Sequence, residues 1–295
     1  MFEDLLFQLE LGLPQVVLGL VNGAFYALLS LGLAVIFGML NVINFAHGAQ
    51  FMMGAFVAWM LLNWVGIGYW PALILSPLIV GAFGVLLEKT MISKLYKLDH
   101  LYGLLLTFGL ALIIEGVFRN QFGSSGLPYA PPEALSGPPV DLGFMFLPKY
   151  RLWVVVAALG LSLATWLVIE KTRLGAYLRA ATENAALVQA FGVNVPRMVT
   201  LTYAAGVALA AFAGVLAAPI YSVNPQMGSS LIIVVFAVVV IGGMGSILGS
   251  VITGFGLGLV EGLTKVFYPE ASSTVIFVIM AIVLLARPAG LFGRA

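Results

Sequence analysis

The chain has no cysteine, and only 8% of its 295 residues are charged. The absence of cysteine excludes a disulfide framework, a thiolate nucleophile and a sulfur-ligated metal site. Soluble domains carry about 25% charged residues, so this chain lacks the polar surface that a water-facing domain needs. Because 62% of its residues are hydrophobic, the sequence predicts an integral membrane protein.

Further absences exclude whole classes of function. There is no GxxxxGK[ST] loop, so this chain has no backbone cradle for nucleotide phosphates. Its net charge of +1 and its lack of long basic runs argue against nucleic-acid binding. No His, Asp and Glu constellation typical of a metal or hydrolytic site is apparent. We therefore expect no catalytic residues, no metal and no cofactor on this chain.

The hydrophobic runs predict membrane-spanning helices. A helix that crosses about 30 Å of hydrocarbon needs about 20 apolar residues, and open strands would leave backbone groups unpaired in lipid. The predicted spans are 14–39, 44–63, 70–88, 101–122, 152–170, 197–221, 230–244, 247–266 and 274–287. The chain is thus predicted to be an all-α polytopic membrane protein, with residues 1–295 forming a single transmembrane domain. The seventh and ninth runs are short, so about 8–10 transmembrane helices are expected.

The basic residues predict the orientation, because Lys and Arg concentrate in cytoplasmic loops. Nine of the 13 lie at 89–97, at 171–197 or near the C-terminus, which belong to one side if all nine spans cross. This predicts a cytoplasmic 171–196 loop and C-terminus. The first thirteen residues carry three acids and no Lys or Arg, which is not the start of a cleaved signal peptide. The N-terminus and the Pro/Gly-rich 123–151 loop are predicted to lie outside, the loop as irregular coil.

The stretch "NVINFAHGAQ" interrupts the first two spans with polar residues. Asn41, Asn44 and His47 follow one another at intervals of three, which would place them on one face of a helix. One interpretation is a cytoplasmic turn between helices, capped by asparagine and broken by glycine. The other is a broken helix whose polar groups, with Gln50, line a translocation path. A second glycine-rich break, "VVIGGMGSILGS", favours the broken helix, because paired interruptions point to a transporter's central site.

Few other ionisable groups are predicted to lie deep in the membrane. Two acid–base pairs at i,i+4 spacing, expected near helix ends, are Glu115–Arg119 and Glu261–Lys265. Glu88 is expected at a cytoplasmic boundary without a special role. Only His47 remains deep in the membrane, which is too little for a proton pump, so the driving energy must come from elsewhere.

A row of glycines follows the second break. Glycines four apart let helix backbones approach closely in a membrane. We therefore expect tight helix packing, rather than chemistry, at Gly245, Gly249, Gly254, Gly258 and Gly262.

The 171–196 loop contains "LRAATENAALVQAFGV", which predicts a short amphipathic helix. The helix is expected to begin at Glu183, with Thr182 as its N-cap, and to stop at Gly192. A helix lying on the lipid surface would carry Lys or Arg on its polar face. None occurs between Glu183 and Val195, which favours docking into a groove on another protein.

Several motifs together resemble the membrane permease of branched-chain amino acid ABC importers, the LivH type. They are "INFAHG", "RAATENAALVQAFGVN", "AGVLAAPIYSVNPQMG", "VVIGGMGSILGSVITGFGLGLVE" and "RPAGLFG", in the expected order over about residues 14 to 293. The resemblance implies a bacterial inner-membrane location and a heterodimer with a sister permease. It also implies two cytoplasmic ATPase subunits that bind ATP and Mg²⁺, and a periplasmic solute-binding protein.

The resemblance also implies roles for individual residues of the cytoplasmic loop. Coupling to the ATPase is implied for Glu183, Ala185, Ala186 and Gly192, with Arg179 and Asn184 as flanking contacts. The stretch "SSLIIVVFAVVV" departs from the family's pattern: it is more apolar and lacks a basic residue often found there. That departure bears on the substrate, which in relatives of this type is an amino acid, urea, an amide or an aromatic acid.

We therefore expect a permease subunit of an ATP-driven importer for branched-chain amino acids or a related small carboxylate or amide. The alternative is a stand-alone secondary carrier or channel for a small solute, which would work without partners. An intramembrane enzyme would need an acid–base or metal constellation that this sequence does not offer.

Overall fold

The computed structural model of the chain describes residues 2–40, 42–96 and 98–293. The predicted site residue Asn41 therefore lies outside the described residues. The described α-helices are α1 (Phe2–Leu40), α2 (Ala46–Val65), α3 (Tyr69–Thr90), α4 (His100–Phe122), α5 (Lys149–Lys171), α6 (Arg173–Ala190), α7 (Val195–Tyr221), α8 (Ser229–Gly242), α9 (Ile247–Phe267) and α10 (Val275–Ala286). Short 3₁₀ turns are η1 (Ile92–Leu95), η2 (Glu133–Leu135) and η3 (Pro269–Ala271).

Each predicted span coincides with one of these helices, and the all-α membrane fold is confirmed. Within the described residues, seven helices are long and apolar enough to cross a membrane, while α8 and α10 are shorter apolar helices. With 14 and 12 residues, α8 and α10 extend only about 21 and 18 Å at 1.5 Å per residue. Neither covers about 30 Å of hydrocarbon alone.

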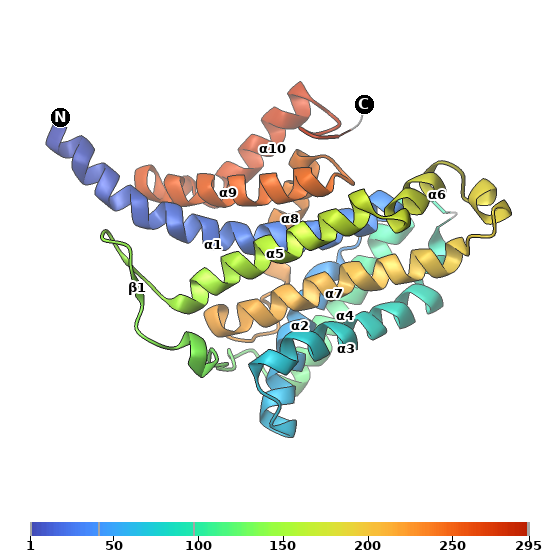
Figure 1. Cartoon of the computed structure of the whole chain (residues 1–295), viewed down its shortest axis with the longest axis horizontal. Helices are drawn as coiled ribbons and strands as arrows, with labels where there is room; N and C mark the ends of the chain where they lie inside the picture. Colours follow the sequence, from blue (N-terminus) through green and yellow to red (C-terminus); the bar gives the residue numbers. More distant parts are fainter. Residues whose placement is uncertain (1, 41, 97, 294–295) are drawn as a thin grey trace.

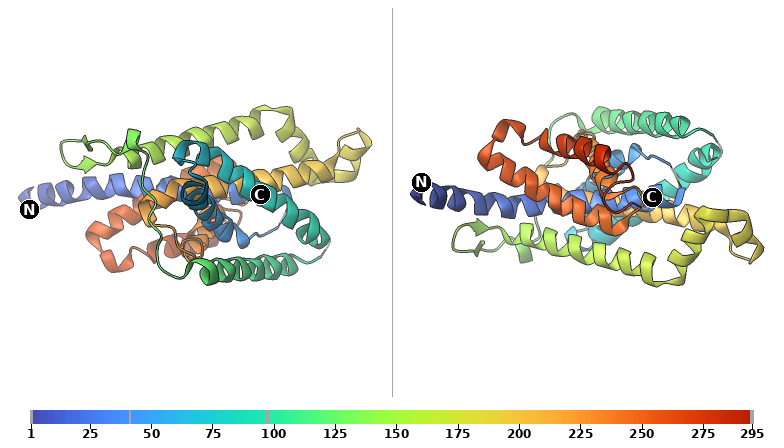
Figure 2. Two further views of the ribbon diagram at one scale, coloured as in Figure 1. Left: turned by 90° about the horizontal axis from the view of Figure 1, so that it is seen from below. Right: turned by 90° about the horizontal axis from the view of Figure 1, so that it is seen from above.

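The long helices run roughly parallel along the molecule, as Figure 1 shows for α1, α5, α7 and α9. The kinked helix α6 lies at one end. The other end carries the N-terminus and the strand pair β1 (Val140–Asp141) and β2 (Phe146–Leu147). Figure 2 shows α4 and α5 on opposite sides of a centre that holds α1, α2 and α7. The 123–148 connection, predicted as coil, contains this short hairpin, η2 and an isolated bridge from Leu127 to Val223; the rest of its backbone is irregular.

Glycines set the close contact between α1 and α9. A side chain at Gly254, Gly258 or Gly262 would overlap the backbone of α1, so these three positions let the two helices touch. The other two glycines of the predicted row lie elsewhere. Gly245 meets Gly38 at the end of α1, and Gly249 meets Gly242 of α8. The row therefore serves two places: the α1–α9 contact and the turn between α8 and α9.

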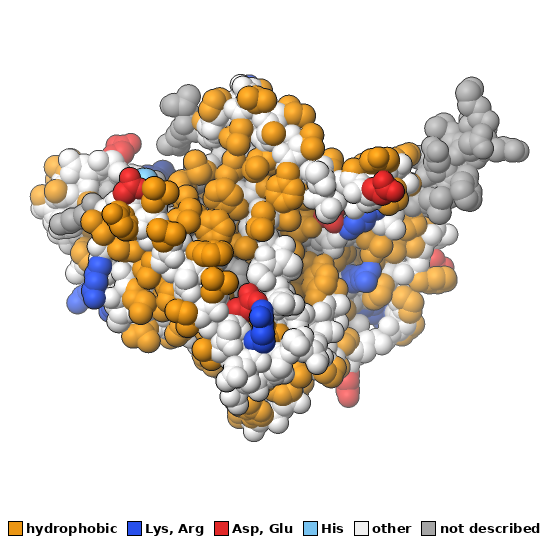
Figure 3. All heavy atoms as spheres, turned by 180° about the vertical axis from the view of Figure 1, so that it is seen from behind, with side chains coloured by type: hydrophobic (Ala, Val, Ile, Leu, Met, Phe, Trp, Pro, Cys, Tyr) orange, Lys and Arg blue, Asp and Glu red, His pale blue; other side chains and the backbone are white. Residues whose placement is uncertain are grey.

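The outer helices present apolar side chains to their surroundings. In the apolar stretch of α4, and in that of α5, only 22% of the residues are buried. The exposed residues include Leu105, Ile113, Val156 and Leu163. The face in Figure 3 is covered mostly by hydrophobic side chains, with isolated charged ones. Such a surface is stable against lipid tails and costly in water, which fits helices at the periphery of a membrane protein.

Candidate functional site

The α1–α2 break lies inside the helical bundle. The Phe45 N–H donates to Thr107 Oγ1 of α4 at 3.1 Å, and Thr107 Oγ1 in turn donates to the Ile43 carbonyl at 3.0 Å. His47, in the first turn of α2, contacts the Leu29 carbonyl in the middle of α1. Thr107 and Leu29, which make these contacts, lie well inside α4 and α1. The structure therefore places the break within the bundle rather than in a surface turn.

Four side chains at this break form what we call the buried polar cluster: Asn44, His47, Gln50 and Tyr203. Each is at most 1% exposed. Asn44 Nδ2 donates to Gln50 Oε1 and to the Tyr203 hydroxyl, both at 3.2 Å, and Gln50 Nε2 donates to the same hydroxyl at 3.1 Å. Buried polar groups need such partners to offset their lost hydration. The cluster therefore ties the start of α2 to α7.

The imidazole of His47 packs against Gly32 of α1, at the place where α1 approaches Gly206 of α7. An added Cβ at Gly32 would come within 2.9 Å of the ring and 2.7 Å of the Gly206 carbonyl. The ring Nε2 lies 3.1 Å from the Leu29 carbonyl. Among the described residues, neither His47 Nδ1 nor Asn44 Oδ1 has a hydrogen-bond partner. These two atoms leave the cluster with unused polar capacity.

The first break and the glycine-rich second break have different glycine contacts. Gly48 of α2 packs against Gly228, immediately before α8. By contrast, the "GGMG" break meets the end of α1 at Gly38 and the C-terminal segment at Gly293. The segment 222–228, which links α7 to α8, thus packs against the start of α2, and the second break packs against the end of α1.

Glu88 near the end of α3 is a buried carboxylate, where the sequence suggested an unremarkable boundary residue. It is 3% exposed, and it accepts hydrogen bonds from Tyr96 Oη at 2.8 Å and from Thr200 Oγ1 at 2.7 Å. Burial, together with this carboxylate, raises the pKa of the Tyr96 hydroxyl above its usual value. Thr200 lies three residues before Tyr203, so the two side chains share one face of α7. They connect Glu88 of α3 to the buried polar cluster.

The predicted cytoplasmic helix exists, but it begins earlier and is capped differently. Helix α6 starts at Arg173, and its backbone leaves helical geometry at Asn184, with φ −150° and ψ 90°. Asn184 Oδ1 accepts from the Leu187 N–H at 2.9 Å, so Asn184 is the N-cap of the second half. The predicted N-cap, Thr182, instead donates its hydroxyl to the Arg179 carbonyl at 2.7 Å. Asparagine competes well for a cap, because its short side chain reaches the backbone two or three residues on.

Gly192 follows α6 in left-handed backbone geometry. Its φ is +84°, and its N–H donates to the Gln189 carbonyl at 2.9 Å. A left-handed residue is a common way to end a helix, and glycine adopts this geometry without steric cost. The structure therefore has the helix end close to where the sequence predicted it.

We call residues 183–192, for which the sequence predicted a coupling role, the coupling segment. Its side chains are mostly exposed, including those of Glu183, Ala185 and Ala186. Leu187 is 55% and Phe191 80% exposed, whereas Val188 packs inward at 8%. Leu187 and Phe191 are four residues apart and so lie on one side of the chain. The segment thus presents an apolar edge beyond the bundle.

Arg179 does not share this outward orientation. Its Nη1 donates to the Ile169 carbonyl at 3.0 Å and to Glu170 Oε2 at 3.2 Å. It therefore caps the end of α5 and holds the first half of α6 against it.

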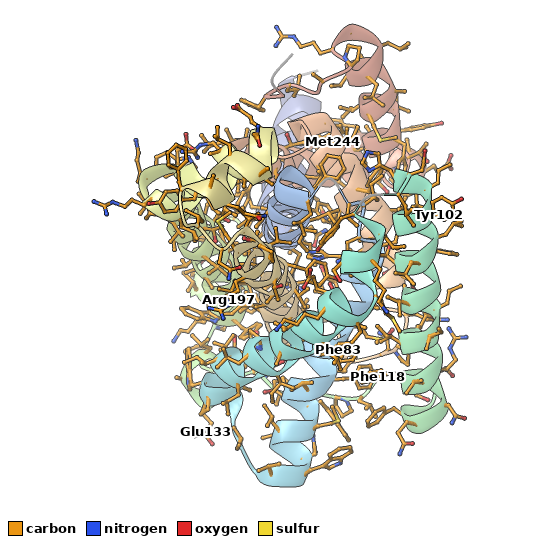
Figure 4. The ribbon with its side chains drawn as sticks, turned by 90° about the vertical axis from the view of Figure 1, so that its right-hand side faces the viewer. Phe83, Tyr102, Phe118, Glu133, Arg197 and Met244 are labelled. Carbon is orange, nitrogen blue, oxygen red and sulfur yellow. The ribbon has the colours of Figure 1, made fainter. Side chains whose placement is uncertain are left out.

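Figure 4 looks onto this end of the molecule. It also shows Phe118 of α4 pointing toward α2, where the ring of Phe118 lies 4.8 Å from that of Phe56.

Both predicted acid–base pairs form: Glu115 with Arg119 and Glu261 with Lys265. Over the described residues, no group of three or more His, Cys, Asp or Glu side chains could hold a metal ion. The described arrangement thus offers a polar break inside the bundle and an exposed apolar segment outside it.

Comparison with known proteins matches nearly the whole chain. The family model described as branched-chain amino acid transport system / permease component matches residues 15–284. The chain is 30% identical to the high-affinity branched-chain amino acid transport system permease protein BraD of Pseudomonas aeruginosa, over 96% of both chains. It is 29% identical to LivH of Escherichia coli K12, again over 96% of both. It is 26% identical to E. coli LivM, over 90% of this chain and 67% of LivM. No solved structure matches.

Proposed function

The chain belongs to the family of permease components of branched-chain amino acid transport systems, and from that premise we propose that it carries a branched-chain amino acid, or a related small carboxylate or amide, into the cell in an ATP-driven importer. It is a multi-pass membrane protein, and its role is translocation rather than catalysis. The related proteins BraD and LivH are named for high-affinity branched-chain amino acid transport.

The proposed assembly has several subunits. Relatives of this chain include both LivH and LivM permeases, which supports a system with a second permease and hence a heterodimer. Two cytoplasmic subunits would bind ATP and Mg²⁺, and a periplasmic protein would deliver the solute. The location that fits these partners is the bacterial inner membrane, with α6 on the cytoplasmic side.

The observation that carries the proposal is the exposed apolar edge of the coupling segment. Leu187 and Phe191 protrude from the bundle, and the segment carries no Lys or Arg to hold anionic lipid headgroups. An exposed apolar edge on a short helix fits a groove in a partner protein. ATP-driven movement of that partner would pull on α6, which is attached to α5 through Arg179. The helices would then alternate between two states, and nucleotide would select one of them.

Reconstitution in vesicles tests this function against a stand-alone carrier. We expect labelled leucine to accumulate only when the sister permease, the ATPase subunits, the loaded solute-binding protein and ATP are all present. Vesicles that contain this chain alone should show no uptake above that of empty vesicles. Uptake by the chain alone, unaffected by ATP, would support the carrier alternative and contradict the importer.

We propose that the translocation path passes the α1–α2 break, where Asn44, His47 and Gln50 gather; Asn41 precedes them in the sequence. All three are sealed from solvent in this conformation, so the proposal requires that α2 shifts during transport and opens the cluster. Among the described residues, His47 Nδ1 and Asn44 Oδ1 have no hydrogen-bond partner. Toward a polar solute the amide oxygen would accept, and the imidazole nitrogen would accept or donate according to its tautomer.

His47→Ala is expected to impair uptake severalfold while the importer still assembles. The change removes a hydrogen-bonding group from the break, and a typical hydrogen bond contributes about 1 kcal/mol. Initial uptake rates would be compared with the amount of assembled complex on size exclusion. His100→Ala is the matched control, because His100 is the other histidine of the chain and is exposed at the start of α4. Full uptake by His47→Ala would return this residue to a purely structural role.

A further inference from the structure

A second polar region lies at the end of the bundle opposite α6, where α1, the 222–228 segment, α8 and α9 surround a cavity of about 460 Å³. Small-molecule sites usually occupy about 300–1,000 Å³, so the cavity is large enough for one small solute. Its lining residues are Asn22, Tyr26, Phe51, Tyr221, Asn224, Gln226, Met227, Ser230, Leu231, Glu261 and Lys265.

The cavity contains one charge of each sign. Glu261 Oε1 accepts from Lys265 Nζ at 2.6 Å, and Glu261 Oε2 accepts from the Tyr26 hydroxyl at 2.6 Å. The Glu261 side chain is 12% exposed and that of Lys265 is 38% exposed. A carboxylate has about four acceptor sites and an ammonium has three donors. Glu261 and Lys265 therefore keep capacity for a further ammonium and a further carboxylate.

The cavity has an apolar lining as well as the charged pair. Lys265 lies near the end of α9, and Glu261 lies one helical turn deeper. The apolar lining comes from Phe51, Met227 and Leu231, of which Phe51 and Met227 are buried. A ligand that places its charged groups on the pair thus finds apolar side chains beside it. This arrangement matches an α-amino acid with an aliphatic side chain.

The cavity also approaches the buried polar cluster. Phe51, which lines the cavity, directly follows Gln50 of the cluster in α2. The 222–228 segment contributes Asn224, Gln226 and Met227 to the cavity wall, and the same segment ends at Gly228 against Gly48. A shift of α2 or of this segment would therefore change the cavity and the cluster together.

The other acid–base pair with i,i+4 spacing among the described residues lacks these features. Glu115 and Arg119 of α4 have the same order, the same spacing and similar exposure, at 15% and 49%. Glu115 borders a different cavity of about 250 Å³, whose other lining residues are almost all apolar and do not include Arg119. A pair that only stabilises its own helix would suffice there. The Glu261–Lys265 pair differs because both charges share one polar cavity.

We propose that this cavity is a reception site for the zwitterionic head of an amino acid. The Lys265 ammonium would bind the α-carboxylate, and the Glu261 carboxylate would bind the α-ammonium. The aliphatic side chain would pack toward Phe51, Met227 and Leu231. The proposal rests on the proposed importer function and adds a solute site on the permease itself.

The test uses the complete importer in vesicles, with saturating binding protein loaded with labelled leucine. Glu261→Gln and Lys265→Gln are each expected to lower uptake about tenfold, because a hydrogen bond to a charged group contributes about 1.5–3 kcal/mol. ATP hydrolysis stimulated by the binding protein should persist, because the ATPase subunits are coupled elsewhere. Glu115→Gln and Arg119→Gln are the matched controls and should transport at close to the unsubstituted rate.

A charge exchange separates solute binding from a structural ion pair. The double variant Glu261→Lys/Lys265→Glu keeps an attractive pair but reverses its direction in the cavity, so we expect uptake to stay low while the complex assembles. Restored uptake in that variant, or normal uptake in both single variants, would overturn the reception site and leave the importer function intact. Failure of the unsubstituted importer to accumulate leucine with ATP would instead overturn the proposed function.

Discussion

Gly192→Pro is expected to reduce uptake to background while the permease still inserts and assembles with its sister subunit. Gly192 has a φ of +84°, whereas proline fixes φ near −65°. Proline also lacks the N–H that Gly192 donates to the Gln189 carbonyl. Such a change costs about 3 kcal/mol or more where it breaks local geometry, so the end of the coupling segment should lose its conformation. Phe191, its most exposed apolar residue, would then lose its fixed position.

The measurement compares uptake with ATP hydrolysis in the same vesicles. We expect uptake to disappear while the ATPase subunits either hydrolyse ATP without transport or detach from the permease. Gly66→Pro is the matched control. Gly66 also follows a helix in left-handed geometry, at φ +76°, is exposed, and has no atom within 4 Å of an added Cβ. Its N–H donates to the Leu62 carbonyl at 3.1 Å. Equal losses in both variants would indicate a general folding defect and contradict the coupling role.

Sequence patterns were sufficient for the spans because hydrophobic length is a local property. The short runs at 230–244 and 274–287 indeed became the short helices α8 and α10. The choice between two neighbouring N-cap residues was harder to predict. Thr182 and Asn184 both qualify as N-caps, and the kink at Asn184 decided between them. The sequence contained that signal, because asparagine is at least as good a cap as threonine.

Contacts between distant segments could not be inferred from one chain's pattern. Glu88 stands at the end of an apolar run, as a boundary residue would, and only the approach of Thr200 and Tyr96 makes its burial possible. Likewise Tyr203 joins the cluster from a position 153 residues beyond Gln50. A tyrosine in an apolar helix carries no mark of such a partner. The packing of Gly48 on Gly228 is equally invisible to hydrophobic periodicity.

The α1–α9 contact gives the second large effect: Gly258→Val is expected to prevent the chain from folding. A side chain at Gly258 would overlap the backbone of Gly19 and Gly23. Backbone atoms inside a packed helix cannot rotate away as a flexible side chain can, so the two helices would have to separate. Overpacking costs about 1–3 kcal/mol and occasionally more, and we expect the upper end or beyond because the clash involves main-chain atoms on both sides. Little monodisperse protein should then be recovered in detergent.

Gly256→Val provides the control, because it makes the same replacement in the same helix two residues away. An added Cβ at Gly256 has no atom within 4 Å, so only intrinsic helix propensity changes there, by a few tenths of a kcal/mol in favour of valine. Yield, size-exclusion profile and thermal unfolding midpoint would be measured for both variants. We expect Gly256→Val to match the unsubstituted chain and Gly258→Val to be lost. Recovery of Gly258→Val at the level of Gly256→Val would show that the close α1–α9 contact is not needed for folding. We expect the opposite, because close packing, rather than hydrophobic burial, holds helices together in membranes.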